Sequence, residues 1–354
     1  MRKFTNESDW KIGYIKSLNY WSQLLTKKKV NSVFFGGGTP SLMNPDTIQD
    51  IISKIKDSWK ISKDLEVTLE ANPTSVESER FKNFSNVGIN RVSIGIQSLI
   101  DKDLKKLGRL HSSLEAKNAY NIARANFERV SFDLIFGRQF QSLKAWELEL
   151  NEALNMSPDH LSLYQLTIER NTQFEKLLSK GKLQGLPSNR KSISFYKTNQ
   201  RLCNLAGLKA YEISNYAKPG SESQHNLIYW RGGEYLGIGP GAHGRVNLRN
   251  SRYRTNAPLN PEKWLSEVEN NNIQKFTIKK LSRKEIADEY FMMALRLSEG
   301  LDVGYYNSLS EIPLDFTTTN KLIELGLIKL DKGKLKTTNR GKLLTDQLIK
   351  TFLC

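Results

Sequence analysis

Residues 30–40 read VNSVFFGGGTP, a run of β-branched and aromatic residues that ends in three glycines and a proline. Such a run is typical of a buried strand followed by a tight turn. Four more runs of this kind follow, and an amphipathic segment separates each from the next. They cover residues 65–71, 91–97, 129–136 and 160–168. The alternation predicts an α/β fold built on a parallel sheet.

Helix-start signals lie between the predicted strands. Asn44 precedes a proline and an isoleucine-rich amphipathic segment, which predicts an N-cap. Ser112 and Glu115 have the spacing of a capping box for another helix. A sixth strand is predicted over 207–216. Residues 232–244 hold six glycines in thirteen positions, which predicts an irregular loop.

The length and the pattern of the last third predict more than one domain. A chain of 354 residues exceeds the usual size of one compact core, and its 38% of hydrophobic residues can bury a large one. From Ser282 onward, two or three helices, a β-hairpin and a last helix predict a small winged-helix-like domain. We therefore divide the chain into an α/β domain at 1–245, a linker region at 246–281 and a C-terminal domain at 282–354.

Charge and cysteine content narrow the class of protein. Lys and Arg outnumber Asp and Glu by 53 to 37, for a net charge of +16, but the basic residues are scattered. This scattering favours a solvated basic surface over a surface that binds nucleic acid, and it is also consistent with a peripheral membrane contact. No apolar run resembles a membrane span or a signal peptide, which predicts a cytoplasmic protein. Cys203 and Cys354 have neither disulfide nor metal-ligand spacing.

Polar residues and glycines follow the predicted strands, at the sheet edge where parallel α/β folds bind ligands. The glycines at 36–38 leave backbone groups bare for a small polar ligand, although a tight turn explains them equally well. Neither a dinucleotide fingerprint nor a Walker lysine is present, which argues against the usual nucleotide sites. Glu70 and Asp133 are carboxylates in apolar strands and need a partner or a ligand. Arg109 is a candidate for a ligand carboxylate, although such an arginine alone is more often a surface residue.

Seven motifs follow one another in an order that resembles one protein family. They are VFFGGGTPSLM at 33–43, TLEANP at 68–73, GINRVSIGIQS at 88–98, DLIFG at 133–137, LSLYQLTIE at 161–169, YEISNYAKPGSESQHNLIYW at 211–230 and YLGIGPGAH at 235–243. Together they resemble the HemW and HemN group of radical S-adenosylmethionine proteins over nearly the whole chain. HemN is the oxygen-independent coproporphyrinogen III oxidase, and HemW is regarded as a haem chaperone. The HNLIYW segment, Arg109 and the short C-terminal domain look more like HemW.

The resemblance implies a partial (β/α) barrel followed by a winged-helix-like domain. In the family, a glycine turn, two acids, a glutamine and an arginine contact S-adenosylmethionine. Carried over by motif, these residues are Gly37, Gly38, Thr39, Glu70, Gln97, Arg109 and Asp133. Among the four histidines, His225 is the best candidate for a haem ligand, and a hydrogen bond within its own loop is an equally good interpretation.

One family motif is missing from the sequence. The resemblance implies a [4Fe-4S] cluster held by three cysteines in the pattern CxxxCxxC after a first strand, but no cysteine precedes Cys203. The chain as written therefore cannot assemble the cluster, and we expect an incomplete N-terminus rather than a degenerate relative. Without that first strand, the strand at 30–36 becomes an edge strand. Two turns also differ, because 137–141 read GRQFQ where the family usually has GLPGQ, and 169–172 read ERNT in place of EPGT.

Three functions are consistent with the resemblance and the composition. The favoured one is a chaperone that binds haem and delivers it to haem-accepting apoproteins, with S-adenosylmethionine and the cluster as the family's cofactors. The enzymatic alternative is oxidative decarboxylation of coproporphyrinogen III. The third is nucleic-acid binding through the winged-helix-like tail and the positive charge. Enzymatic activity and oligomeric state are left open.

Overall fold

The computed structural model describes residues 6–156 and 158–353. Contacts divide the chain into two compact units. One unit runs up to Val33 and also contains Met43–Glu66 and the chain from Gln224 on; the other contains Phe34–Leu42 and Val67–Ser223. The division therefore falls within the first two strands of the main sheet.

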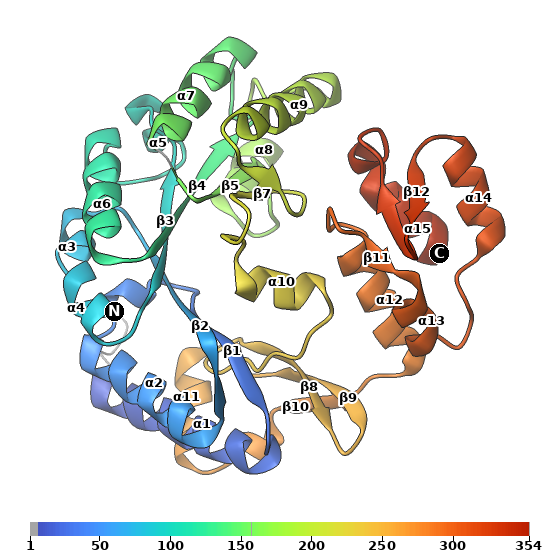
Figure 1. The fold of residues 1–354 in the computed structure, drawn as a ribbon. Helices are drawn as coiled ribbons and strands as arrows, with labels where there is room; N and C mark the ends of the chain where they lie inside the picture. Colours follow the sequence, from blue (N-terminus) through green and yellow to red (C-terminus); the bar gives the residue numbers. More distant parts are fainter. Residues whose placement is uncertain (1–5, 157, 354) are drawn as a thin grey trace. The chain divides into compact units, whose positions relative to one another are not determined.

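A seven-stranded sheet contains all five of the strands first predicted, in the order β1-β2-β3-β4-β5-β7-β6 (Figure 1). Neighbours from β2 to β5 are parallel, and β7 and β6 pair antiparallel beside them. The predicted α/β class is confirmed, and β1 is an end strand of the sheet, as expected. The strands are β1 (Lys29–Phe35), β2 (Lys60–Ala71), β3 (Arg91–Gln97), β4 (Arg129–Phe136), β5 (His160–Gln165), β6 (Lys209–Ala210) and β7 (Asn215–Ala217).

The prediction of one continuous strand over 207–216 is wrong. The segment contains β6 and the start of β7, with a turn between them. In this turn the carboxylate of Glu212 accepts the backbone N–H of Ser214 at 3.0 Å and a side-chain N–H of Asn215. A carboxylate that binds the backbone just after it closes a turn, so the chain reverses and β6 pairs antiparallel with β7.

The predicted helix starts are confirmed. Asn44 caps α2 by accepting the backbone N–H of Asp46 at 3.0 Å. Ser112 and Glu115 form both hydrogen bonds of the capping box of α6. The helices of this part of the chain are α2 (Pro45–Ser58), α3 (Ser75–Ser78), α4 (Phe81–Asn86), α5 (Asp101–Lys106), α6 (Ser113–Asn126), α7 (Leu143–Asn155), α8 (Gln173–Ser179) and α9 (Asn189–Leu205), with a short 3-10 turn at Pro40–Leu42.

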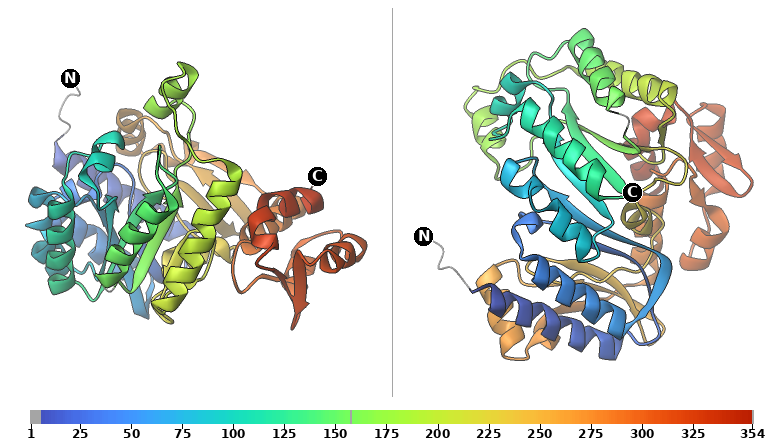
Figure 2. Two further views of the ribbon diagram at one scale, coloured as in Figure 1. Left: turned by 90° about the horizontal axis from the view of Figure 1, so that it is seen from above. Right: turned by 60° about the vertical axis from the view of Figure 1, so that its left-hand side comes forward.

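Successive side chains of β4 point to opposite faces of the sheet, and α6 and α7 cover one of these faces. The ring of Phe132 packs against Tyr120 of α6 at 5.2 Å, and that of Phe136 packs against Trp146 of α7 at 5.7 Å. Figure 2 shows these helices on the outer side of the strands. Asp133 lies one residue after Phe132 and therefore projects from the opposite, inner face.

A second, antiparallel sheet has the order β10-β9-β8 and packs against α1 and α11. Trp21 of α1 shares a buried cluster with Val246 of β8, and Trp264 of α11 is fully buried. The stretch 246–281, predicted as a linker, thus contains packed secondary structure, while the boundaries at 245 and 282 stay predictions. The elements are α1 (Glu7–Leu24), α10 (Gln224–Trp230), β8 (His243–Leu248), β9 (Ser251–Asn256), α11 (Pro261–Glu269), a 3-10 turn at Ile273–Lys275 and β10 (Thr277–Lys280). The predicted irregular loop lies before β8.

The C-terminal segment has the helices and the hairpin of the predicted winged-helix-like domain. A three-stranded antiparallel sheet, β11-β13-β12, packs with the helices around Phe291 and Leu335, which are fully buried. Lys332 and Gly333 adopt positive φ at the hairpin turn between β12 and β13. The elements are α12 (Arg283–Ala294), β11 (Leu301–Asp302), α13 (Val303–Leu309), α14 (Phe316–Glu324), β12 (Ile328–Asp331), β13 (Lys334–Thr337), a 3-10 turn at Gly341–Leu344 and α15 (Thr345–Leu353). Among the described residues, no helix has both the length and the apolar character that a membrane span needs.

Candidate functional site

The inner face of β2 to β5 is polar. The strand register places Glu70 beside Ser93, and Asp133 beside Ser162. Because alternate residues share a face, the side chains of this inner face form one set. Its polar members near the carboxyl ends of the strands are Thr68, Glu70, Ser93, Ser131, Asp133, Ser162 and Tyr164, with Ile135 as an apolar member and Gln97 after a register shift at the end of β3. Such a face is suited to a polar ligand rather than to a second apolar layer.

Glu70 connects the end of β2 to the glycine turn after β1. Its Oε2 accepts the backbone N–H of Gly37 at 3.0 Å. Gly37 and Gly38 have φ of +80° and +64°, which side chains rarely adopt, and the space beside each α-carbon is open. Thr39 follows in the same turn, and its carbonyl accepts the N–H of Leu42 at 3.1 Å. The partner that Glu70 was predicted to need is therefore a backbone donor, and the turn beside it exposes bare peptide groups.

Asp133 keeps part of its surface exposed, yet protein atoms surround it on most sides. This desolvation, together with the nearby negative charge of Glu70, raises the pKa of its carboxyl to about 6. A hydrogen bond from Ser162 and the positive charges of Arg91 and Arg109 oppose the shift. Glu70 and Arg109 are therefore both close enough to Asp133 to influence the pKa of its carboxyl. A carboxyl with a pKa near 6 can exchange a proton at physiological pH.

Arg109 lies between α5 and α6 and is half-buried. Burial lowers the pKa of its guanidinium, and the charge of Asp133 opposes that shift. Two residues on, the Nε2 of His111 lies 3.0 Å from the carbonyl oxygen of Ile96, which fixes the segment against β3. A partly desolvated arginine held in this way is suited to bind a carboxylate with its planar fork.

Gln97 ends β3 in a conformation that is unusual for its residue type. It is buried and has a φ of +70°, in the left-handed region. The register between β3 and β4 shifts between Ile94 and Gln97, and Gln97 pairs with Leu134. Strained residues of this kind concentrate at binding sites, because surrounding structure must hold them.

A buried ion pair supports the loops that follow β3 and β4. Arg138 and Glu149 are both buried, and the two guanidinium nitrogens of Arg138 donate to both carboxylate oxygens of Glu149. Oε1 of Glu149 also accepts the hydroxyl of Ser98 at 2.7 Å and the N–H of Leu99 at 2.9 Å. The turn GRQFQ, which differs from the usual family pattern, thus introduces the positive charge of Arg138, and Glu149 neutralises this charge. Sequence reasoning missed this role because Glu149 lies on a helix far from the turn.

The inner-face residues Ser162 and Tyr164 were also missed. Ser162 donates to Asp133, and Tyr164 interacts with Ser162 and Asn215. Burial raises the pKa of the Tyr164 hydroxyl, as does the charge of Asp133. The alternation in LSLY carried this signal, because its two leucines lie on one face of β5 and Ser162 and Tyr164 lie on the other.

His225 lies in the other compact unit, at the start of α10. Its backbone N–H donates to Oε1 of Glu66 at 3.1 Å, and its ring packs edge-on against Tyr229 with centroids 4.6 Å apart. The structure thus brings Gly37, Glu70, Arg109 and Asp133 together by hydrogen bonding and charge. Gln97 ends the neighbouring strand β3, and Thr39 lies in the glycine turn after β1. His225 belongs to the other compact unit.

The two implied cofactors fit the described residues unequally. The glycine turn, Arg109 and the two acids offer backbone groups, a cation and acceptors, which match the charges of an amino-acid sulfonium nucleotide. For an iron–sulfur cluster, no group of three His, Cys, Asp or Glu side chains in 6–156 and 158–353 is placed to hold a metal. Cys203 is buried, which raises its pKa to about 12, and Cys354 lies outside the described residues. These residues do not fit a cluster.

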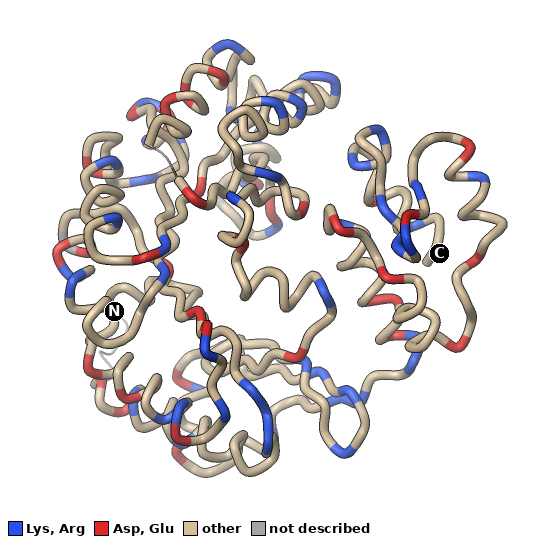
Figure 3. Tube along the Cα trace, viewed as in Figure 1, with Lys and Arg blue, Asp and Glu red and all other residues tan. Residues whose placement is uncertain are grey.

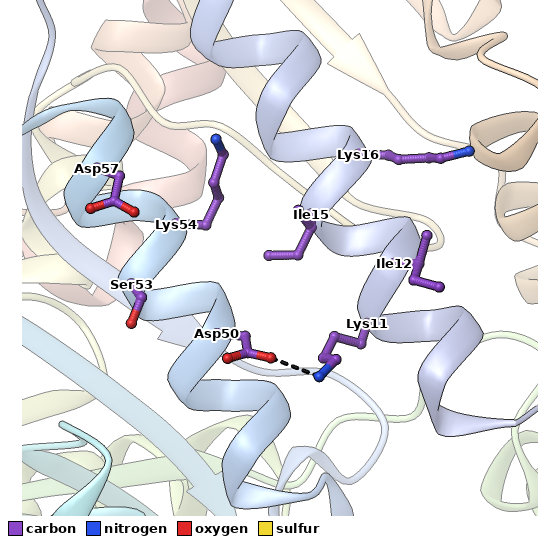
Figure 4. Close-up of a pocket in the computed structure, with 8 residues that line it drawn as sticks. All are labelled: Lys11, Ile12, Ile15, Lys16, Asp50, Ser53, Lys54 and Asp57. Carbon is purple, nitrogen blue, oxygen red and sulfur yellow. Dashed lines mark ion pairs between the residues drawn. The ribbon is translucent and has the colours of Figure 1, made fainter.

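A groove between α1 and α2 contains none of the predicted site residues (Figure 4). The ion pair of Lys11 with Asp50, at 2.7 Å, lies across it. Its lining combines two isoleucines with three lysines, two aspartates and a serine: Lys11, Ile12, Ile15, Lys16, Asp50, Ser53, Lys54 and Asp57. We assign no function to this groove.

Comparison with known proteins gives the family. The model of the radical SAM superfamily matches residues 8–148, and that of the HemN C-terminal domain matches residues 281–344. The heme chaperone HemW of Haemophilus influenzae is 34% identical over 95% of this chain and 86% of its own length. HemW of Escherichia coli is 35% identical over 92% of this chain and 85% of its own length.

The chain belongs to the HemW-type family of radical SAM proteins. A zebrafish (Danio rerio) relative named radical S-adenosyl methionine domain-containing protein 1, mitochondrial, is 37% identical over 92% of this chain and 76% of its own length. The solved structure of the coproporphyrinogen III oxidase HemN from Escherichia coli has a TM-score of 0.79. It covers 99% of this chain and 84% of that chain at 17% identity, which confirms the partial-barrel fold with its C-terminal domain. Membership implies S-adenosylmethionine and a [4Fe-4S] cluster as the cofactors of the family.

Proposed function

We propose that the protein binds haem and delivers it to acceptor proteins. The observation that carries this proposal is the similarity to two proteins named heme chaperone HemW, which extends over more than nine-tenths of this chain. The solved HemN structure shares the fold at low identity and therefore does not favour oxidase activity over haem delivery. Haem-accepting apoproteins are the partners that this function requires.

His225 is the proposed iron ligand. His111 and His160 are buried and hydrogen-bonded to the carbonyl of Ile96 and the hydroxyl of Tyr211, respectively. His225 and His243 have accessible surface. Of these two, His225 is the better ligand because contact with the ring of Tyr229 orients its imidazole, and an oriented neutral imidazole is a common axial ligand of haem iron.

The residues proposed to bind S-adenosylmethionine are those gathered at the strand ends. Gly37, Gly38 and Thr39 offer backbone groups to the ammonium, and Arg109 pairs with the carboxylate. The remaining acceptors and amide, which suit ribose hydroxyls, come from Glu70, Gln97 and Asp133. When bound, S-adenosylmethionine would supply a sulfonium centre, and the role of these residues would be to bind its amino-acid group and its ribose.

Titration with haemin tests the proposal. The purified protein is expected to shift and sharpen the Soret band at a stoichiometry of one haem per chain. His225→Ala should weaken binding about tenfold or more, whereas His243→Ala, which removes the other accessible histidine, should not. Transfer of the bound haem to apomyoglobin, used as a trap, would measure release.

Other outcomes would replace the proposal. Absence of a saturable Soret change in the wild-type protein would exclude haem carriage. Release of carbon dioxide from coproporphyrinogen III would support the oxidase instead. Binding to duplex DNA that weakens steeply with salt and is unaffected by haem would support nucleic-acid binding.

A further inference from the structure

One face of the β8–β9–β10 sheet is lined by cations. Arg245 of β8 lies directly opposite Arg254 of β9, and Arg254 lies opposite Lys279 of β10. Residues paired in this way project from the same face, as does Arg252, two residues before Arg254. The other face packs on α1 through Val246 and its neighbours. Figure 3 shows the basic positions along β8 and β9. We call Arg245, Arg252, Arg254 and Lys279 the cationic face.

The cationic face is only half neutralised. Arg245 pairs with both carboxylate oxygens of Glu289 at 2.9 Å, and Lys279 pairs with Glu285 at 2.9 Å. Arg252 donates to the carbonyl oxygen of Gly233 at 2.9 Å, and the part of the chain that the structure describes provides no ion pair for it. Among the described residues no ion pair is found for Arg254, and its Nε is buried without an acceptor. Two carboxylates therefore serve four cations.

Such an arrangement is costly unless an anion completes it. Like charges directly opposite one another destabilise an antiparallel pair, and a buried donor without an acceptor loses its hydration. An unsatisfied donor on Arg254, next to two excess positive charges, indicates a site for a ligand that carries carboxylates or other anions.

Aromatic rings connect the cationic face to His225. The ring of Tyr229 contacts His225 at 4.6 Å and Tyr235 at 4.2 Å. Tyr235 and Arg245 exchange backbone hydrogen bonds of 2.8 and 2.7 Å. All these residues belong to the same compact unit. An imidazole, a pair of stacking rings and an excess of cations therefore form one continuous set, which matches the metal, the apolar ring and the two carboxylates of a haem.

We propose that the cationic face binds the propionate carboxylates of haem, with Arg254 as the principal partner. This inference rests on the proposed haem-carrier function and adds the part of the haem that is recognised. Two propionates carry two negative charges, which equals the excess charge of the face. Arg254 offers a guanidinium fork to one of them, and Arg252 is beside it to share the other.

Paired titrations with two iron porphyrins test the inference. The probes are haemin and its dimethyl ester, in which both propionates are neutral. Arg254→Gln is expected to weaken haemin binding about tenfold and to leave binding of the ester unchanged. Arg254→Lys keeps the charge but loses the fork, and should recover part of the affinity. Arg249→Gln, an exposed arginine at the tip of the same hairpin, removes the same charge and should change neither affinity.

The outcomes separate this inference from the proposed function. If the wild-type protein binds haemin and its ester equally well, haem carriage stands and propionate recognition is wrong. An equal loss of both ligands in Arg254→Gln would also overturn it, and unfolding curves would show whether the fold had changed. If Arg254→Gln lost affinity for duplex DNA and kept its affinity for haemin, the face would be a phosphate-binding surface instead. No haemin binding by the wild-type protein would overturn both proposals.

Discussion

The inner face of β2 to β5 and the cationic face of β8 to β10 both carry charged residues on a sheet, but they balance the charges differently. On the inner face, Glu70 has the N–H of Gly37, and Asp133 has Ser162 and the charge of Arg109. On the cationic face, Arg254 has no ion pair among the described residues, and its Nε lacks an acceptor. Both acids of the inner face therefore have hydrogen-bonding or charged partners within the chain.

This difference separates two ways of preparing a binding site. A balanced face is held in one geometry before any ligand arrives, at the cost of burying paired charges. An unbalanced face leaves a free-energy penalty that only the ligand removes, which favours the ligand-bound state. Removing a charge should therefore destabilise the protein where a buried partner pairs with that charge, as Glu149 pairs with Arg138. It should stabilise the ligand-free protein where burial or repulsion outweighs the partners, as at the ionised Asp133 and at Arg254.

The largest expected effect concerns the balanced network around Glu149. Glu149→Ala should lower the free energy of unfolding by about 3–5 kcal/mol, because it leaves the buried guanidinium of Arg138 without its main partner. Urea unfolding curves would measure the change. Glu147→Ala, on the same helix, breaks the exposed pair with Arg201 and should cost less than about 1 kcal/mol. Equal losses in the two variants would show that the buried pair is not structural.

The raised pKa of Asp133 gives a pH-dependent test. The folded protein holds this proton up to about pH 6, whereas the unfolded chain releases it near 3.8. The wild-type protein therefore loses stability relative to Asp133→Asn as pH rises between these values, by up to about 3 kcal/mol at pH 7. Unfolding free energies at pH 4.5, 5.5 and 7 would show the difference grow. A difference that is constant with pH would mean that Asp133 titrates normally.

The contact between Glu70 and the glycine turn gives a smaller expected effect. Glu70→Gln should weaken binding of S-adenosylmethionine about tenfold, near 1.4 kcal/mol, because a neutral amide loses the charge next to Gly37. Isothermal titration calorimetry would measure this affinity. Glu79→Gln, an exposed acid at the end of α3, is the control and should bind normally. Unchanged affinity in Glu70→Gln would remove Glu70 from the proposed site.

The smallest expected effect has the opposite sign. In the ligand-free protein, Arg254→Gln should raise the free energy of unfolding by about 0.5 kcal/mol, because it relieves repulsion by Arg245 and Lys279. Arg245→Gln removes a cation that Glu289 neutralises and should lower it instead. Thermal unfolding of both variants without haem would compare them. A loss of stability in both variants would show that Arg254 is not an unbalanced charge of the cationic face.

The sequence predicted the elements whose signals are local. The capping box of Ser112 and Glu115 is contained in four residues, and the limits of β3 and β4 follow from period-two runs between turn residues. The strand over 207–216 was predicted wrongly because the turn at Glu212 depends on side-chain hydrogen bonds that residue preferences do not show.

The candidate site divides in the same way. The sequence by itself determined which residue types end each strand. Because parallel strands place their carboxyl ends at one edge of a sheet, it also predicted that these residues lie along that edge. Tertiary structure alone decided that Gly37 donates to Glu70, that Glu149 neutralises Arg138 and that the Nε of Arg254 has no acceptor among the described residues. Each of these results depends on atoms from different strands and helices, whose distances and desolvation exist only once the chain has folded.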